Sequence, residues 1–230
     1  ATCSQVVHIN MEHFGLKLVK KKYSLHLKRE EFALINTKPS LPVFNSLIEK
    51  NAYKDATYQE YSQEWCEKYR ELCLKNFDLN IEYYNKLNTD DFLKSLDSFF
   101  KKYSKFVKID DLNNYSEASG YYIMVLDKYK QIYIGKSLDI KKRIKQHWST
   151  TKRFDRTLFP MYNVKSCFSI DFFRALDTTR IYAWKREVEN GVEAELISNF
   201  PKDYCTNRIG RDIVNGIEAI ATLNEHAFID

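Results

Sequence analysis

Two tyrosines, an arginine and a histidine stand at spacings that could bring them to one site. Gly120 to Tyr122 begins one apolar run, and Tyr133 to Gly135 ends the next. A basic stretch then carries Arg143 and His147, which are four residues apart and would share one face of a helix. Cleaving a phosphodiester bond requires an activated water and positive charge near the phosphoryl oxygens. These side chains, with a later carboxylate, are the groups of a one-metal phosphodiester cleavage site.

Two β-prone runs contain the tyrosines. Residues 121–126 and 131–134 are rich in apolar and aromatic side chains, and the short connection 127–130 separates them. This arrangement predicts a β-hairpin. If the two runs pair, Tyr122 and Tyr133 point toward the same face of a sheet.

The elements after the hairpin complete the predicted frame. Ser137 and Asp139 are both suitable caps for a helix that ends near residue 148 and carries the arginine and the histidine. We expect a third strand over residues 167–174 and a further helix over residues 179–199. A last helix is expected from residue 217.

The N-terminal half has the pattern of amphipathic helices. Apolar and aromatic residues recur every three or four positions from Tyr58 to Leu72 and again from Leu93 to Tyr103. Thr89, followed by two aspartates, suits the cap position between the two stripes. An aromatic stripe at this spacing is more typical of a core than of a base-stacking surface. We therefore expect this half to be mainly helical, with a packing core of its own.

A polar, turn-forming stretch over residues 110–119 separates the two halves. We predict an α+β protein in three parts. Residues 1–110 form a mainly helical N-terminal domain, residues 118–208 form a small three-stranded antiparallel or mixed sheet flanked by helices, and residues 209–230 form a tail that packs on the sheet domain.

Composition limits the class of protein. The 230 residues are 44% hydrophobic and 29% charged, which is typical of a globular protein. No apolar run reaches the roughly 20 residues that cross a bilayer, and the N-terminal segment lacks the order of a signal peptide. We expect a cytoplasmic protein without a membrane partner. The five cysteines form no C-x-x-C pair and are expected to be free thiols.

The positive charge is concentrated in one part of the chain. Residues 128–186 contain fifteen Lys or Arg and four acidic residues, whereas residues 1–115 contain eighteen basic and sixteen acidic residues. A concentrated basic field is typical of proteins that bind a polyanion. A solvated lysine-rich face is the alternative, and it fits any single run of lysines better.

Five sequence elements in order resemble the GIY-YIG nucleases over about residues 118–208. The matching strings are GYY at 120–122, YIGKS at 133–137, RIKQH at 143–147 and EAELI at 193–197, followed by Pro201 and Asn207. A single YIG string carries little weight, but five elements at family-like spacing are specific. The resemblance implies a GIY-YIG-like nuclease domain and hydrolysis of DNA with one Mg²⁺ or Mn²⁺ ion per active site.

The resemblance implies that Tyr122 and Tyr133 line the active site. One of them is expected to be the general base or to orient it, and the sequence does not distinguish the two. A free phenol has a pKa of about 10, so a tyrosine base at neutral pH needs nearby positive charge. Lys136 or a metal-bound water could supply that charge.

Three further residues receive catalytic roles from the resemblance. Arg143 corresponds to the arginine that binds the scissile phosphate, and His147 is expected to position the phosphate or to transfer a proton. Glu193 is the expected metal ligand, because it precedes, with two residues between, the Leu-Ile pair of the family's carboxylate motif. By chemistry alone, Glu189 or Glu195 would serve as well.

Basic residues around this set are expected to contact the nucleic-acid backbone. They are Lys141, Lys142, Lys145, Lys152, Arg153 and Arg156. Asn207 is a further candidate, although the family's asparagine comes sooner after its proline. Its equivalence rests on that imperfect spacing.

The leading hypothesis is a DNA endonuclease, of the kind found in restriction or phage defence. The helical N-terminal part would supply DNA binding, dimerisation or regulation, and a homodimer would allow cleavage of both strands. Two alternatives remain open. One is an RNA-cleaving, toxin-type nuclease, and the other is an inactive nucleic-acid-binding regulator on the same scaffold.

Overall fold

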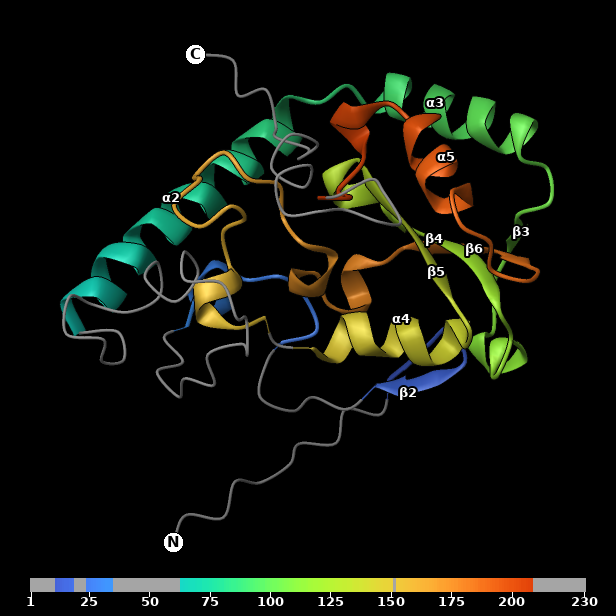
Figure 1. Ribbon diagram of the computed structural model, residues 1–230, viewed down its shortest axis with the longest axis horizontal. Helices are drawn as coiled ribbons and strands as arrows, with labels where there is room; N and C mark the ends of the chain where they lie inside the picture. Colours follow the sequence, from blue (N-terminus) through green and yellow to red (C-terminus); the bar gives the residue numbers. More distant parts are fainter. Residues whose placement is uncertain (1–10, 19–23, 35–62, 151, 209–230) are drawn as a thin grey trace, which may run out of the picture.

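The structure, a computed structural model, describes residues 11–18, 24–34, 63–150 and 152–208 (Figure 1). Within them the chain forms four α-helices and two small antiparallel sheets, which confirms the predicted α+β class. None of the described helices is long and apolar enough to span a membrane.

Several predictions concern residues outside the described part. They are the C-terminal tail with its helix from residue 217, the start of the first helical stripe at Tyr58, and Cys3. Cys66, Cys73, Cys167 and Cys205 are buried thiols, and no disulfide forms among these four.

The predicted hairpin is present. Strand β4 covers Gly120–Leu126 and strand β5 covers Gln131–Ser137, and they pair antiparallel with Tyr122 opposite Gly135 and Met124 opposite Tyr133. A short turn joins the strands and ends at Lys130, which has a left-handed backbone with φ 51°. Every residue of β4 is buried, so this strand is the centre of the sheet.

The third long strand lies elsewhere than predicted. Strand β6 covers Arg180–Lys185 and pairs antiparallel with β4, so the predicted helix over 179–199 is wrong in its first part. Ile181 and Ala183 are buried and alternate with half-buried neighbours, which is the two-residue period of a strand. Tertiary pairing with β4 therefore fixes this segment as a strand.

The predicted strand over residues 167–174 is also wrong. This segment is irregular and contains a short 3₁₀ turn at Ile170–Phe172, which Ser169 caps. Phe168 and Phe173 are fully buried against other parts of the core. A short apolar run fits a strand or any other buried segment, and its periodicity does not separate the two.

The main sheet has four strands in the order β3-β6-β4-β5, all antiparallel, where three strands were predicted. The additional strand, β3, is a two-residue edge at Val107–Lys108. Figure 1 shows α3 and α5 on one side of this sheet and α4 on the other.

Helix α4 covers Ile140–Ser149, close to the prediction. The Asp139 side chain accepts a hydrogen bond from the Lys142 backbone N–H at 2.8 Å, so of the two predicted caps this residue is the N-cap. Helix α5 covers only Val192–Ser198 and follows Gly191, whose φ is 84°. The predicted long helix is thus reduced to this last part.

Two long helices come from the N-terminal half. Helix α2 covers Gln63–Lys86 and helix α3 covers Thr89–Lys102. The cap of α3 is Asn88, one residue before the predicted position, and its side chain accepts from the backbone N–H groups of Asp90 and Asp91. Both stripes therefore form helices, as predicted.

Each of these helices shares a core with the main sheet. Buried residues of α2 pack with Tyr122, Met124 and Leu126, which lie on one face of β4. Buried residues of α3 pack with Tyr121, Ile123 and Val125 on the opposite face, together with Leu196 of α5. The expected separate core of the helical half is not observed among the described residues.

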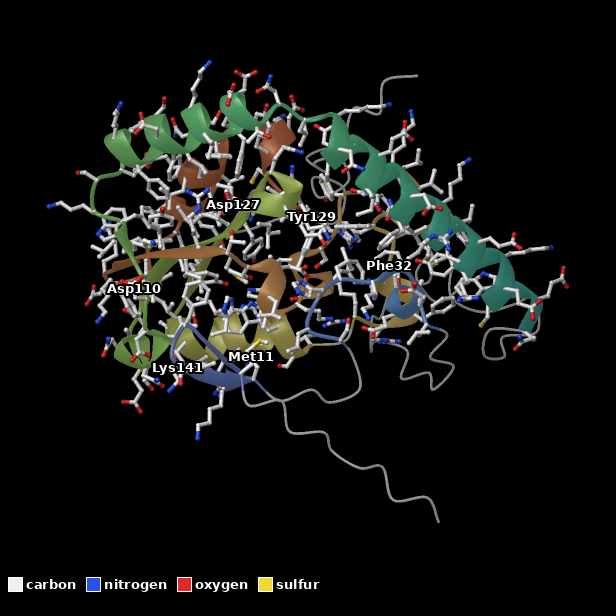
Figure 2. The ribbon with its side chains drawn as sticks, turned by 180° about the vertical axis from the view of Figure 1, so that it is seen from behind. Met11, Phe32, Asp110, Asp127, Tyr129 and Lys141 are labelled. Atoms are coloured by element: carbon white, nitrogen blue, oxygen red, sulfur yellow. The ribbon has the colours of Figure 1, made fainter. Side chains whose placement is uncertain are left out.

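A small hairpin of β1, Met11–His13, and β2, Leu16–Leu18, lies beside α4. Figure 2 shows Met11 of this hairpin close to the α4 region that carries Lys141. The rings of His13 and Trp148, the latter near the end of α4, have centroids 5.8 Å apart. The hairpin therefore supports the outer side of the helix that carries Arg143 and His147.

Candidate active site

A cavity of about 470 Å³ brings together residues from β5, α4, α5 and two irregular segments. Four of the six predicted catalytic residues line it directly. They are Tyr133, Arg143, His147 and Glu193. The rest of the lining comes from residues 152–171 and 206–208, which the sequence motifs cover only in part.

The hairpin register explains how the two tyrosines meet. Tyr122 and Tyr133 lie on the same face of the sheet, with ring centroids 6.2 Å apart. A Cβ atom on Gly135, which pairs with Tyr122, would lie 2.5 Å from the Tyr122 Cζ atom. Only a glycine leaves room here for the Tyr122 ring to cross β5.

Gly120 permits a second close approach at the start of β4. Its φ is +150°, and a Cβ atom there would lie 2.1 Å from the carbonyl oxygen of Trp184 in β6. A side chain is therefore excluded by the neighbouring strand. Both motif glycines allow strands and rings to pack at distances that other residues forbid.

His147 is the centre of a buried hydrogen-bonded chain. Its Nε2 atom lies 2.8 Å from the Tyr122 hydroxyl, and its Nδ1 atom lies 2.7 Å from Oδ1 of Asp171. An ionised carboxylate can only accept, so Nδ1 carries the proton and Nε2 accepts from the phenol. Lys152 donates to the other oxygen of Asp171 at 3.2 Å and also contacts Ser169 Oγ at 3.2 Å.

The surroundings favour a neutral histidine beside an ionised aspartate. Burial lowers the pKa of His147 and outweighs the opposite effect of Asp171. Burial alone would raise the pKa of Asp171, but the hydrogen bonds from His147 and Lys152 and the positive charge of Lys152 hold it well below its usual range. Burial also raises the pKa of Tyr122, which therefore keeps its proton at neutral pH.

Arg143 lies beside both phenols at the cavity. Burial alone would lower the pKa of Arg143, but Tyr122 and Tyr133 raise it above its ordinary value. Its guanidinium is therefore charged at any physiological pH. A planar, permanently charged fork at the wall of a cavity suits a phosphate.

Glu193 extends from the first turn of α5 into the cavity, and its Oε2 atom lies 3.7 Å from Lys136 Nζ on β5. Its neighbours in sequence have other partners. Glu189 pairs with Arg186, and Glu195 accepts a hydrogen bond from the Tyr103 hydroxyl at 3.0 Å. Geometry therefore places Glu193, and neither of these two glutamates, at the cavity.

The donor set fits one kind of metal site. Among the described residues, no group of three or more His, Cys, Asp or Glu side chains could hold an ion by themselves. A hydrated Mg²⁺ or Mn²⁺ ion needs fewer protein ligands, because waters and phosphate oxygens complete its shell. Glu193, an accessible carboxylate in a cavity with Arg143, suits such an ion.

The predicted nucleic-acid-binding residues fall into two places. Lys152 and Arg156 line the cavity, and Arg153 beside them pairs with Asp155 at 3.2 Å. The other three belong to α4 and line a separate shallow hollow on its outer side. They are Lys141, Lys142 and Lys145.

Asn207 lines the cavity but is also tied to β5. Its Oδ1 atom accepts from the Ile134 backbone N–H at 3.0 Å, and its Nδ2 atom donates to the Ile134 carbonyl at 2.8 Å. The side-chain amide thus makes with Ile134 the two hydrogen bonds that the backbone of a neighbouring strand would make. We interpret Asn207 as holding the strand that carries Tyr133.

Six residues of the cavity lining were not predicted from the sequence, among them Ser169, Asp171 and Arg208. Ser169 and Asp171 lie in the segment that was predicted as a strand, and no motif marks them. Arg208 follows Asn207 directly, so its basic charge next to a candidate residue was the one available signal.

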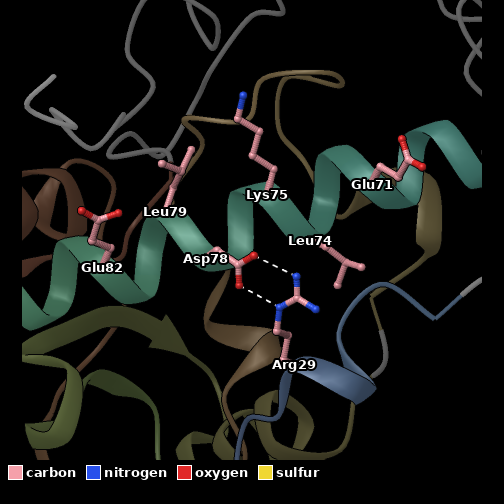
Figure 3. Close-up of a pocket in the computed structure, with 7 residues that line it drawn as sticks. All are labelled: Arg29, Glu71, Leu74, Lys75, Asp78, Leu79 and Glu82. Atoms are coloured by element: carbon pink, nitrogen blue, oxygen red, sulfur yellow. Dashed lines mark hydrogen bonds and ion pairs between the residues drawn. The ribbon is translucent and has the colours of Figure 1, made fainter.

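A second hollow of about 400 Å³ lies over α2 (Figure 3). Arg29 donates there from Nε and Nη2 to both oxygens of Asp78, at 2.7 and 2.8 Å. The pair joins residues 29–31 to α2 at the surface. The ion pair in this hollow is exposed, and the other lining side chains are aliphatic or charged. We therefore assign the pair the role of tethering residues 29–31 to α2.

Comparisons with known proteins do not extend the assignment. No protein-family model, curated protein or solved structure matches this chain.

Proposed function

We propose that this chain is a metal-dependent nuclease of the GIY-YIG type that hydrolyses phosphodiester bonds in DNA. One observation carries the proposal. Tyr133, Arg143, His147 and Glu193 come from three different elements and line one cavity. All four belong to the sequence strings that resemble the GIY-YIG nucleases.

We propose that the hydrogen-bonded chain behind the cavity removes the proton from the attacking water. Tyr122 accepts that proton on its oxygen while its own proton passes to Nε2 of His147, 2.8 Å away. Asp171 stabilises the resulting imidazolium through Nδ1. Tyr133 lacks such an acceptor in the described contacts, so we assign it to orienting the water.

Access of water to the Tyr122 oxygen depends on the neighbouring side chain of Arg143. Tyr122 is fully buried, whereas Tyr133, Arg143 and His147 line the cavity. Arg143 lies next to the Tyr122 phenol. We propose that Arg143 turns toward the scissile phosphate when substrate binds, which opens the Tyr122 oxygen to water.

Glu193 would hold the metal ion at the cavity. When bound, Mg²⁺ or Mn²⁺ would neutralise charge on the leaving oxygen and polarise a water. Lys136, 3.7 Å from Glu193, balances the carboxylate and keeps its side chain near the cavity. Arg143 then stabilises the charge on the phosphoryl oxygens.

The test compares Glu193→Gln with Glu195→Gln, a matched change on the same helix whose side chain contacts Tyr103 instead. Plasmid, single-stranded DNA and total RNA are incubated with each protein in Mg²⁺ or EDTA. We expect wild type and Glu195→Gln to cut plasmid with Mg²⁺ only, and Glu193→Gln to lose at least about 100-fold of the rate while still binding DNA.

The outcomes separate the competing functions. Degradation of RNA with intact plasmid would replace DNA by RNA as the substrate. No cleavage of any nucleic acid by wild type would contradict the nuclease proposal and leave a binding protein. Equal cleavage rates for the two variants would contradict the role of Glu193 as the metal ligand.

A further inference from the structure

One wall of the cavity is formed by three cations that the catalytic proposal does not use. Lys152 and Arg156 come from the segment after α4, and Arg208 comes from the end of the described chain. With Arg143 they make four basic side chains in the lining, against the carboxylates of Asp171 and Glu193. The cavity therefore carries more positive charge than one phosphate and one metal ligand account for.

Arg208 is held in place by neutral groups. Its Nε atom donates to the Cys167 carbonyl at 2.6 Å, and its Nη2 atom donates to the Thr157 carbonyl at 2.7 Å. The guanidinium also lies 5.6 Å from the centre of the Phe172 ring. These contacts fix the orientation of the group but supply no negative charge to balance it.

Lys152 has a carboxylate partner that is already shared. Asp171 accepts from both Lys152 and His147, so a single negative charge serves two donors. Burial lowers the pKa of Lys152 and brings that of Arg208 to about 10, and the repulsion between the two cations lowers the pKa of Lys152 further. An anion placed between these side chains would relieve that repulsion.

We propose that Lys152, Arg156 and Arg208 bind a second phosphate of the substrate strand, next to the phosphate that is cleaved. The inference rests on the proposed function, because a nucleic-acid strand presents phosphates at every nucleotide. Guanidinium forks are suited to phosphate, and the volume of the cavity is within the range that holds a nucleotide-sized ligand. This wall would hold the strand in register so that its neighbouring phosphate reaches Arg143 and Glu193.

Binding of small nucleotides tests the subsite without requiring cleavage. The probes are thymidine 3′,5′-bisphosphate, which carries two phosphates, and thymidine 5′-monophosphate, which carries one. Calorimetry in EDTA compares wild type with Arg156→Gln and with Arg29→Gln. The last is the control, because Arg29 pairs with Asp78 over α2, away from the cavity.

We expect the bisphosphate to bind wild type and Arg29→Gln about tenfold more tightly than the monophosphate. Arg156→Gln should lose most of this preference and keep its affinity for the monophosphate. Arg208→Lys, which retains the charge but not the fork, should lose part of it. Melting curves of each variant verify that the fold is retained.

Equal affinity of wild type for the two probes would overturn the subsite. So would equal behaviour of Arg156→Gln and Arg29→Gln. Failure here is distinct from failure of the nuclease proposal, since a protein that cleaves DNA but shows no preference for two phosphates contradicts only the subsite. A protein that prefers the bisphosphate but cleaves nothing contradicts only the hydrolytic role.

Discussion

His147 illustrates how single contacts set the chemistry of a residue. Its ring is almost fully buried, with the Tyr122 hydroxyl at one nitrogen and Asp171 at the other. The carboxylate fixes which nitrogen bears the proton, and burial keeps the ring neutral. Asp171 is therefore a positioning residue that acts through His147, and its effect should appear in the pH dependence of the rate.

Replacing Asp171 by Asn should separate positioning from simple structural support. We expect kcat to fall about 10- to 100-fold with little change in KM. Because the Asp171 charge raises the pKa of His147, its removal lowers that pKa, and the acid limb of the pH–rate profile should move to lower pH. Cleavage rates measured from pH 5 to 8 provide the test.

The control for this change is Asp203→Asn, whose carboxylate accepts from Tyr83 away from the cavity. It should leave both the rate and the acid limb unchanged. An Asp171→Asn protein with a reduced rate but an unmoved acid limb would assign Asp171 to stability alone.

The residues of the site were only partly predictable from sequence. Tyr122, Tyr133, Arg143, His147 and Glu193 fall into ordered motifs, so their types and spacing were visible. Asp171 and Arg208 reach the same cavity through irregular segments, where no periodicity relates sequence position to direction. Long-range packing alone brings them to His147 and Lys152.

The helices and strands that depend on local contacts are the ones that the sequence predicted correctly. The β4–β5 hairpin and α4 carry their own turn and cap residues, and both appear within a few residues of their predicted limits. Strand β6 was misread because its six residues also fit a helix when taken without a partner. Its pairing with β4, more than fifty residues earlier, decides the outcome.

Helix α2 supports the irregular segment that forms one cavity wall. Asn76, fully buried on this helix, donates to the carbonyls of Val164 and Ser166, each at 2.7 Å. Asn80, one turn later, also donates to Ser166. These amides connect the helix to the chain just before Ser169 and Asp171, so α2 contributes indirectly to the site.

Asn76→Ala should therefore destabilise the protein. We expect a loss of about 1–3 kcal/mol in the free energy of unfolding, because the partly buried carbonyl of Val164 and the buried carbonyl of Ser166 each lose a donor. Urea unfolding measures the change, and Lys75→Ala on the same helix is the control. A loss no larger than that of the control would show that the segment is held by other contacts.

For the whole molecule, the distribution of charge predicts how nucleic acid approaches. The basic residues are concentrated after residue 128, and those on the outer side of α4 lie apart from the cavity. Contacts of this kind release counterions and do not read sequence. We expect them to contribute to affinity rather than to catalysis.

The triple change of Lys141, Lys142 and Lys145 to Gln tests this expectation. Affinity for duplex DNA at low salt should fall, and the slope of log affinity against log salt should become shallower by about two to three. Fluorescence anisotropy across a salt series measures both. The same change at Lys68, Lys75 and Lys86 of α2 is the control, and an equal effect of the two triples would remove α4 from the interface.

Residues 205–207 cover the outer edge of β5, and this limits how two copies of the protein could assemble. Backbone contacts of Cys205 and Thr206 with Ile132, together with the Asn207 amide at Ile134, occupy the hydrogen-bonding edge of this strand. A continuous sheet across two molecules cannot form through a strand whose peptide groups are already satisfied. Any dimer that cuts both strands of a duplex must therefore join through surfaces other than this edge of β5.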